Sequence, residues 1–219
     1  MFNELFKNLP AQTTADATYY VDPLNGVDTN SGLTSALAYK TFAMIPKTIN
    51  HHIDVQILTP RDGFIAVEEF NGSGILDILI DDGATSDIVE IYLLNCTCNI
   101  RIVQEGVTVQ TYSIVTNCKS VRAEGLYGIT LPTTSDCYMR ARNSKVDLYG
   151  CVFIGSTGEA LYAYDSEVSA EGCTFTSSGT GIILLNGSVF YDVGTNTYTT
   201  YSAKGGSKII TVDATVSSA

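Results

Sequence analysis

Two acidic side chains, Glu124 and Asp147, are the best candidates for chemistry in this sequence. A pair of carboxylates on either side of a sugar can act as general acid and as base or nucleophile. Such pairs lie about 5 Å apart in retaining and about 6.5–9.5 Å apart in inverting glycoside hydrolases. Tyr149 offers a ring for sugar stacking, and Arg122 and Glu171 are candidates to bind beside it. The alternative is a chance pair on an acidic surface.

Other chemically competent side chains form no recognisable constellation. The histidines, His51 and His52, are adjacent, so their side chains point apart and make a poor metal chelate. No Ser-His-Asp arrangement can be built from them. The pair Cys96 and Cys98 lacks a second pair with metal-ligand spacing. We therefore expect no metal, no cofactor and six free thiols.

Charge and length limit the class of protein. The chain has 219 residues, which suits one domain, and a formal net charge of −11. A nucleic-acid partner is excluded by this reasoning, because phosphate binding needs clustered Lys and Arg. No run of about 18 apolar residues predicts a membrane span. Residues 1–10 lack the apolar core of a secretory signal, so we expect synthesis in the cytoplasm.

A repeat of about 22 residues predicts the elements that position these side chains. The frame S-x-V-x-x-x-G-C-x-F occurs at residues 144–153 and again at 166–175. The expected corners carry Asn or Asp: Asn95 and Asn117 lie 22 residues apart, Asn143 and Asp165 also lie 22 apart, and Asn186 follows after 21. These residues tolerate the left-handed backbone of a sharp bend between strands. Short strand segments of this kind are stable only when stacked, so we predict an all-β coil of parallel strands with roughly seven rungs.

Alignment on the corners predicts which side chains face outward. Before the corner, the inward positions are Ile91, Leu93, Met139, Ala141, Leu161, Ala163, Ile182 and Leu184. The outward positions are Tyr92, Leu94, Ile114, Thr116, Arg140, Arg142, Tyr162, Tyr164, Ile183 and Leu185. A strand that is apolar on both sides is normally buried on both, so this outward column predicts an oligomer interface. A register slip of one residue would exchange inside and outside.

After the corner, the outward column is polar and acidic. Arg122, Asp147 and Ser169 align in one row, and Glu124, Tyr149, Glu171 and Asp192 align in the next. This alignment predicts a solvated face that carries the candidate carboxylates.

The segment YYVDPLNGVDTNSGL at 19–33, followed by AYKTF at 38–42, resembles the entry of pectate-lyase-like right-handed β-helix proteins. The resemblance implies a right-handed parallel β-helix with a short N-terminal capping helix. It divides the chain into a docking helix with linker at 1–18, a capping segment at 19–52, the β-helix at 53–213 and a tail at 214–219. The acidic residues of the entry could form a calcium loop, but their spacing fits a chain of Asx turns better.

The same resemblance implies a function. Small chains of this type are common among bacteriophage tail spikes and virion appendages, so we expect a structural virion protein, made in the host cytoplasm, that assembles as a homotrimer. An apolar stripe formed by Phe2, Leu5, Phe6 and Leu9 would dock on the chain's own end or on other virion proteins. Host-surface glycan is the expected further partner. The alternative function is a polysaccharide hydrolase or lyase, but the catalytic motifs W-x-D-H and R-x-P-x-x-R of pectate lyases are absent. A pure receptor-binding module is a third possible function.

Overall fold

The computed structural model describes residues 12–58, 63–80, 88–106, 110–128, 137–155, 158–177 and 180–212. The expected docking residues Phe2, Leu5, Phe6 and Leu9, and the expected tail at 214–219, lie outside these ranges.

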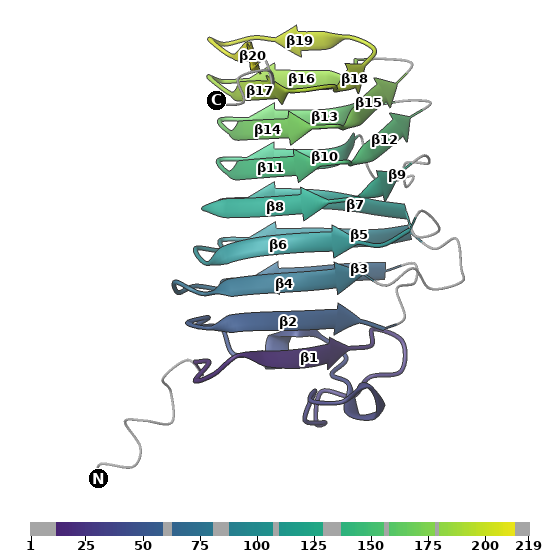
Figure 1. Cartoon of the computed structure of the whole chain (residues 1–219), viewed down its shortest axis with the longest axis vertical. Coiled ribbons are helices and arrows are strands. Elements are labelled where there is room, and N and C mark those ends of the chain that lie inside the picture. The colour runs from purple at the N-terminus through teal and green to yellow at the C-terminus, as the bar shows by residue number, and fades with distance from the viewer. Residues whose placement is uncertain are drawn as a thin grey trace, which may run out of the picture.

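The described chain winds into a parallel β-helix built from three sheets (Figure 1). The nine-stranded sheet has the order β1 (Ala17–Val21), β2 (His52–Ile57), β4 (Ile75–Ile80), β6 (Asn99–Gln104), β8 (Ser120–Glu124), β11 (Lys145–Tyr149), β14 (Glu167–Glu171), β17 (Val189–Val193) and β20 (Lys208–Val212). The seven-stranded sheet has the order β19 (Tyr201–Ala203), β16 (Ile182–Leu185), β13 (Glu159–Tyr164), β10 (Cys137–Arg142), β7 (Gln110–Thr116), β5 (Ile88–Leu94) and β3 (Gly63–Glu68). A four-stranded sheet of β18 (Thr197–Tyr198), β15 (Thr174–Ser177), β12 (Val152–Gly155) and β9 (Tyr127–Gly128) lies between them along the chain.

The coil is right-handed, as the rule for parallel crossovers requires. In Figure 1 the strands of the nine-stranded sheet run to the right in front, those of the seven-stranded sheet return behind, and the chain rises with each winding. The predicted fold class is therefore confirmed.

Side chains that alternate inward fill one continuous core. Every predicted inward residue of the seven-stranded sheet is buried, as Ile91 and Met139 illustrate. The upper windings carry an aromatic stack in which Phe153 lies between Tyr138 and Phe175, at ring distances of 5.8 and 6.0 Å. All six cysteines are buried, and none of them forms a disulfide bond. Apolar burial of this kind supplies the main driving force for folding.

Asparagine forms the corners between the seven- and nine-stranded sheets, as the repeat predicts. Asn95, Asn117 and Asn143 have φ values of 57°, 54° and 47°, in the left-handed region. The Asn117 amide donates to Asn95 Oδ1 at 2.9 Å, and the Asn143 amide donates to Asn117 Oδ1 at 3.0 Å. The stacked amides therefore satisfy one another while holding consecutive windings in register.

The capping segment differs from its expected form. In place of a regular capping helix the chain forms two short 3-10 helices, Ser35–Leu37 and Phe42–Met44, and Phe42 is the buried residue of the second. Pro46 follows closely and disfavours helical continuation in the residues before it. The Asp28 carboxylate accepts from the backbone N–H groups of Lys40 and Thr41 at 2.9 and 2.8 Å. The expected Asx turn is formed by Asp22, whose Oδ1 accepts from the backbone N–H groups of Leu24 at 3.0 Å and Asn25 at 2.8 Å.

Among the described residues, no helix has the length and apolar character that crossing a membrane requires.

Candidate functional site

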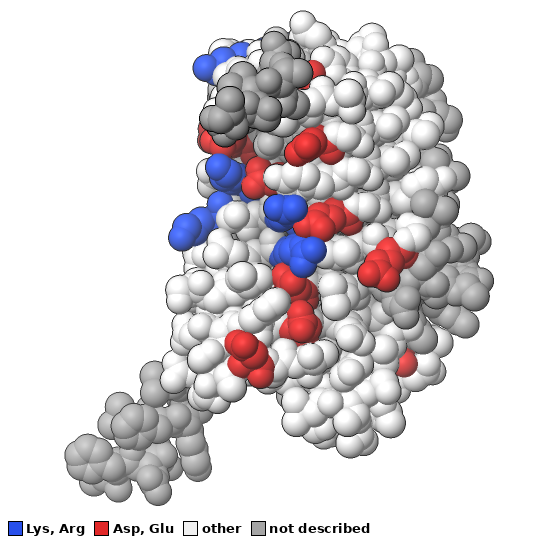
Figure 2. Space-filling model, viewed as in Figure 1, with Lys and Arg blue, Asp and Glu red and all other residues white. Residues whose placement is uncertain are grey.

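Charged side chains concentrate on the outward side of the nine-stranded sheet, which we call the charged face (Figure 2). Its acidic, basic and histidine members are His52, Asp54, Asp77, Arg101, Arg122, Glu124, Lys145, Asp147, Glu167, Glu171 and Lys208. They project outward because strand residues alternate between the core and the surface.

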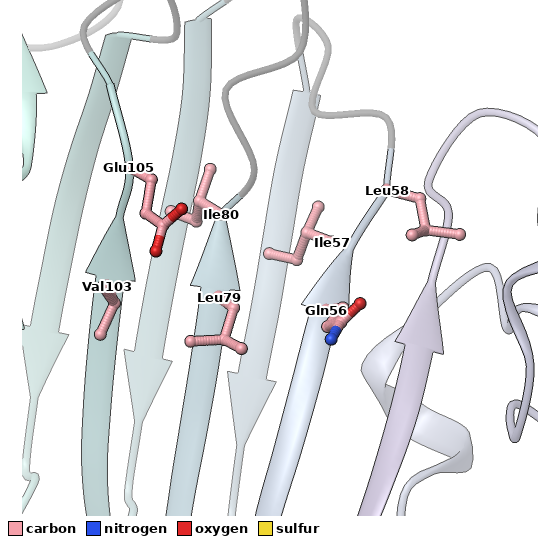
Figure 3. Close-up of a pocket in the computed structure, with 7 residues that line it drawn as sticks. All are labelled: Gln56, Ile57, Leu58, Leu79, Ile80, Val103 and Glu105. Atoms are coloured by element: carbon pink, nitrogen blue, oxygen red, sulfur yellow. The ribbon is translucent and has the colours of Figure 1, made fainter.

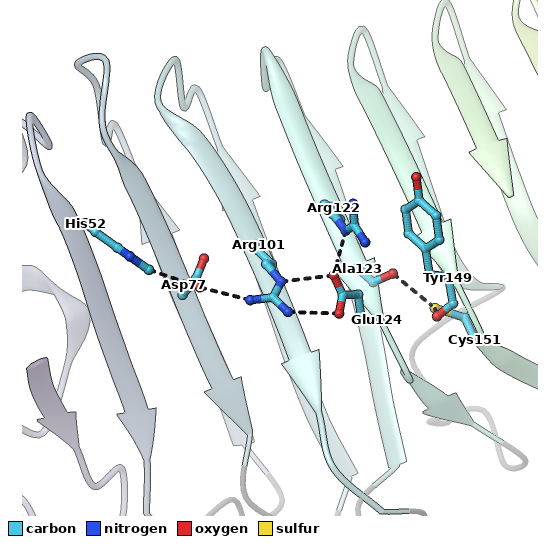
Figure 4. Close-up of polar contacts among 8 residues, drawn as sticks. All are labelled: His52, Asp77, Arg101, Arg122, Ala123, Glu124, Tyr149 and Cys151. Atoms are coloured by element: carbon cyan, nitrogen blue, oxygen red, sulfur yellow. Dashed lines mark hydrogen bonds and ion pairs between the residues drawn. The ribbon is translucent and has the colours of Figure 1, made fainter. Parts of the chain in front are cut away.

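Arg101 is the centre of an ion-pair network on this face (Figure 4). Its guanidinium donates to both Glu124 oxygens, from Nε to Oε1 at 2.9 Å and from Nη2 to Oε2 at 3.0 Å. It also donates to Asp77 Oδ2 at 3.2 Å. Arg122 reaches Glu124 from the other side. These hydrogen bonds, first among them those from Arg101, lower the pKa of Glu124 below its ordinary value.

The carboxyl group of Asp147 has the opposite environment. Asp147 lies directly beside Arg122 in the ladder, while Glu124 lies beside Tyr149. Partial burial raises the pKa of Asp147 above its ordinary value, and this desolvation outweighs the attraction of Lys145. The two candidate carboxylates therefore lie on adjacent strands with pKa values displaced in opposite directions.

The three predicted binding residues lie together on consecutive strands. The guanidinium carbon of Arg122 lies 4.0 Å from the centroid of the Tyr149 ring, a cation–π contact. Tyr149 pairs with Glu171 on the next strand. One face of the Tyr149 ring is therefore covered by Arg122.

The predicted alignment of Asp192 in this row is wrong. Glu171 pairs with Val193, whereas Asp192 pairs with the inward Ala170 and is only 8% exposed. Its carboxylate accepts hydrogen bonds from Asn196 and Tyr198. The step from Asp165 to Asn186 is 21 residues, one fewer than the repeat of 22. Gly187, at a φ of 80°, is an additional residue between this corner and β17, so the strand pairs again in the register of that repeat.

A shallow pocket of about 280 Å³ adjoins the network at the carboxyl ends of β2, β4 and β6 (Figure 3). Leu79 and Val103 contribute apolar surface, and Gln56 and Glu105 contribute polar groups. Gln56, Leu79 and Val103 occupy the same outward row as Glu124 and Tyr149. The pocket and the network thus form one continuous strip of surface with apolar, aromatic and charged groups.

The outward side of the seven-stranded sheet, which we call the apolar face, has the predicted composition. Tyr92, Ile114, Arg140, Tyr162 and Ile183 align in one row. Leu94, Thr116, Arg142, Tyr164 and Leu185 align in the next. The guanidinium carbon of Arg140 lies 5.7 Å from the centroid of the Tyr162 ring, and that of Arg142 lies 6.0 Å from the centroid of the Tyr164 ring. The predicted register is confirmed, and the interface role stays a prediction.

Sequence reasoning missed the lower part of the charged face. His52 Nε2 lies 3.4 Å from Asp54 Oδ1 and 3.1 Å from Asp77 Oδ2, so these three side chains form a cluster beside Arg101. His51 points elsewhere, toward Asp16 at 3.9 Å, as the argument from adjacent residues predicts. The proximity of His52, Asp54 and Asp77 can be recognised only when the register of β2, β4 and β6 is known.

Comparison of the chain with protein-family models, with curated proteins and with solved structures finds no match. The fold and the surface chemistry above are therefore the basis for function.

Proposed function

We propose that this chain is a rigid structural shaft of a bacteriophage or phage-like particle, a tail spike or other appendage, which assembles as a homotrimer and helps attach to host-surface glycan. The resemblance of residues 19–42 to the entry of pectate-lyase-like β-helix proteins favours this class. The observation that carries the proposal is the apolar face.

Apolar and aromatic side chains occupy most of both outward rows of the seven-stranded sheet. Ile114 packs in part against the core, whereas Tyr164 is 39% exposed. Parallel sheets are normally covered on both sides, and an extended apolar surface on a soluble chain marks an interaction site. A second and third copy of the same chain, related by cyclic symmetry, would cover this face on each protomer.

The arginines of the apolar face fit such a seam. Arg140 and Arg142 interrupt otherwise apolar rows, with Glu159 nearby in the same shallow depression. Guanidinium groups tolerate interfaces well, because they bind carboxylates bidentately and stack on aromatic rings. In the proposed trimer they pair with carboxylates of the neighbouring chain.

The charged face supports the attachment part of the proposal. It lies opposite the proposed seam in the solenoid and offers Tyr149 and the pocket at Leu79 and Val103 to a ligand. Sugar rings present apolar patches and hydroxyl groups, which match such mixed surfaces. The net charge of −11 disfavours acidic polysaccharides, so a neutral glycan is the expected ligand.

The test is the mass of the purified chain in solution, measured by light scattering after size exclusion at micromolar concentration. We expect a mass three times the 23.5 kDa of one chain. Tyr162→Glu places a charge in the seam and is expected to yield single chains. Tyr191→Glu is the matched control, because Tyr191 points outward on the nine-stranded sheet. A single-chain mass for the unmodified protein would contradict the trimer.

Polysaccharide cleavage is a second candidate function, favoured by the opposite pKa displacements of Glu124 and Asp147. Pairs of carboxyl groups with separated pKa values are typical of acid and base partners. Asp147 would then hold the proton, and Glu124 would act as the ionised partner.

A panel of bacterial surface polysaccharides separates the two candidates. Binding without release of reducing ends supports attachment alone. Release that disappears in both Glu124→Gln and Asp147→Asn supports the enzyme, whereas release that persists in both variants excludes this pair.

A further inference from the structure

The cluster of His52, Asp54 and Asp77 on the charged face has the donor set of a metal site. One ligand atom from each residue lies within 4.8 Å of the other two. The measured separations from His52 Nε2 are 3.4 Å to Asp54 Oδ1 and 3.1 Å to Asp77 Oδ2. Ligand atoms of a tetrahedral ion with bonds of about 2.0–2.2 Å lie about 3.3–3.6 Å apart. The cluster therefore needs only small side-chain movements to surround such an ion.

Asp77 supplies an independent reason to expect a ligand. This carboxylate is only 5% exposed, and its Oδ1 atom has no hydrogen-bond partner within the described part of the chain. A buried carboxylate oxygen without a partner is costly, and an ion or an ordered water commonly accounts for it.

The charge balance of the surrounding network points the same way. Three carboxylates, from Asp54, Asp77 and Glu124, face two guanidinium groups, from Arg101 and Arg122. Arg101 donates two hydrogen bonds to Glu124 and one to Asp77. The carboxylates nearest to His52 are therefore left with an excess of negative charge.

We infer that His52, Asp54 and Asp77 bind a divalent transition-metal ion, with Zn²⁺ as the best match. An imidazole nitrogen with two carboxylates suits Zn²⁺, whereas Ca²⁺ takes oxygen ligands in larger numbers. The side chains of His52 and Asp54 are 49% and 39% exposed, so the ion enters from solvent and keeps an open position there. Asp16, which accepts a hydrogen bond from the His52 backbone N–H at 3.0 Å, holds the start of this strand in place.

This site is separate from the proposed trimer seam, because it lies on the nine-stranded sheet and the seam lies on the seven-stranded one. Loss of metal binding therefore leaves the mass of the assembly unchanged. The zinc site and the proposed function can fail independently.

The experiment is calorimetric titration of the full chain, prepared without a histidine tag, with Zn²⁺ and separately with Ca²⁺ at neutral pH. We expect one Zn²⁺ per chain, bound more tightly than Ca²⁺. In His52→Ala and in Asp54→Asn the affinity is expected to fall at least about 100-fold, since even outer-sphere substitutions cost about 10–100-fold. His51→Ala is the matched control and retains binding, because His51 lies outside the cluster.

Three results would overturn the site. The first is the absence of Zn²⁺ binding, which would leave His52 with hydrogen bonding to Asp77 as its role. The second is binding that survives in His52→Ala and Asp54→Asn, which would place the ion elsewhere, for instance on the cysteines. The third is tighter binding of Ca²⁺ than of Zn²⁺.

Discussion

The outward positions of the nine-stranded and the seven-stranded sheet lie on the same windings, and the chain fills them in different ways. On β8 and β11 they carry Arg122, Glu124 and Asp147; Glu124 forms ion pairs with Arg101 and Arg122, and Asp147 lies beside Arg122 in the ladder. On β10 and β13 they carry arginine beside tyrosine, within rows of Ile, Leu and Tyr. The inward positions of both sheets are alike, since both supply apolar side chains to one core. The solenoid thus fixes the backbone through its core and leaves the two outer faces free to acquire different partners.

The largest expected effect concerns the core that both faces share. Phe175 is fully buried and lies 6.0 Å from the rings of both Phe153 and Phe190. Phe175→Ala is expected to lower the free energy of unfolding by about 3–5 kcal/mol, through lost burial and the cavity left behind. Phe175→Leu retains most of the volume and serves as the control.

Urea denaturation followed by circular dichroism measures this loss. Because the core lies within one chain, the loss should be the same at all protein concentrations. If the loss of unfolding free energy depended on protein concentration, and this dependence disappeared in Tyr162→Glu, the loss would come from the seam between chains. A loss below about 1 kcal/mol in Phe175→Ala would show that this part of the core is loosely packed.

The next effect tests the charged face alone. Arg101→Met removes the hydrogen bonds to Glu124 and Asp77, so that Asp77 keeps only its contact with His52 and Glu124 keeps only its contact with Arg122 among these pairs. Since Arg101 is itself partly exposed, we expect a loss of about 1–2 kcal/mol in the free energy of unfolding. Arg122→Met removes the more exposed contact to Glu124 and the cation–π contact with Tyr149, and should cost less. Equal losses in the two variants would contradict the central place of Arg101.

The pH dependence of stability separates the two candidate carboxylates. The pKa of Glu124 is lowered in the folded state, so its contribution is present above the ordinary pKa of 4.5 and is lost as the pH falls through the folded value. The difference in unfolding free energy between wild type and Glu124→Gln should therefore shrink below pH 4.5.

For Asp147 the direction is reversed. Its raised pKa means that ionisation in the folded state is unfavourable, so stability is gained as the pH falls through the folded value. Relative to wild type, Asp147→Asn should be more stable at neutral pH than in acid. Chemical denaturation at several pH values measures both variants. If their unfolding free energies relative to wild type changed with pH in the same direction, the two carboxyl groups would have similar environments.

The smallest effect belongs to an exposed ion pair at the edge of the charged face. Lys145 Nζ lies 2.9 Å from Glu167 Oε1, and both side chains are about half exposed. Lys145→Ala should change the free energy of unfolding by no more than about 0.5 kcal/mol. A double-mutant cycle with Glu167→Ala measures the pair directly, and a coupling above about 1 kcal/mol would contradict this assignment.

Much of the fold could be predicted because the corners recur in the sequence. Asn95 and Asn117 lie 22 residues apart, as do Asn143 and Asp165, and each of the four occupies the left-handed conformation at a bend. Once the corners are aligned, alternation along each strand places both rows of the apolar face correctly.

The candidate site was less predictable because the windings below β8 have unequal lengths. The paired positions Asp54 and Asp77, Asp77 and Arg101, and Arg101 and Arg122 are 23, 24 and 21 residues apart. A search at a constant period of about 22 residues misses contacts of this kind. The error at Asp192 has a related cause, since Gly187 adds one residue after the corner.

Covalent labelling of tyrosine, read by mass spectrometry at micromolar protein, compares the two faces most directly. If chains associate through the apolar face, Tyr162 and Tyr164 are protected in the unmodified protein and become reactive in Ile183→Glu. Tyr149 and Tyr191 on the charged face should react to the same extent in both. Equal labelling of Tyr164 before and after the substitution would contradict the seam.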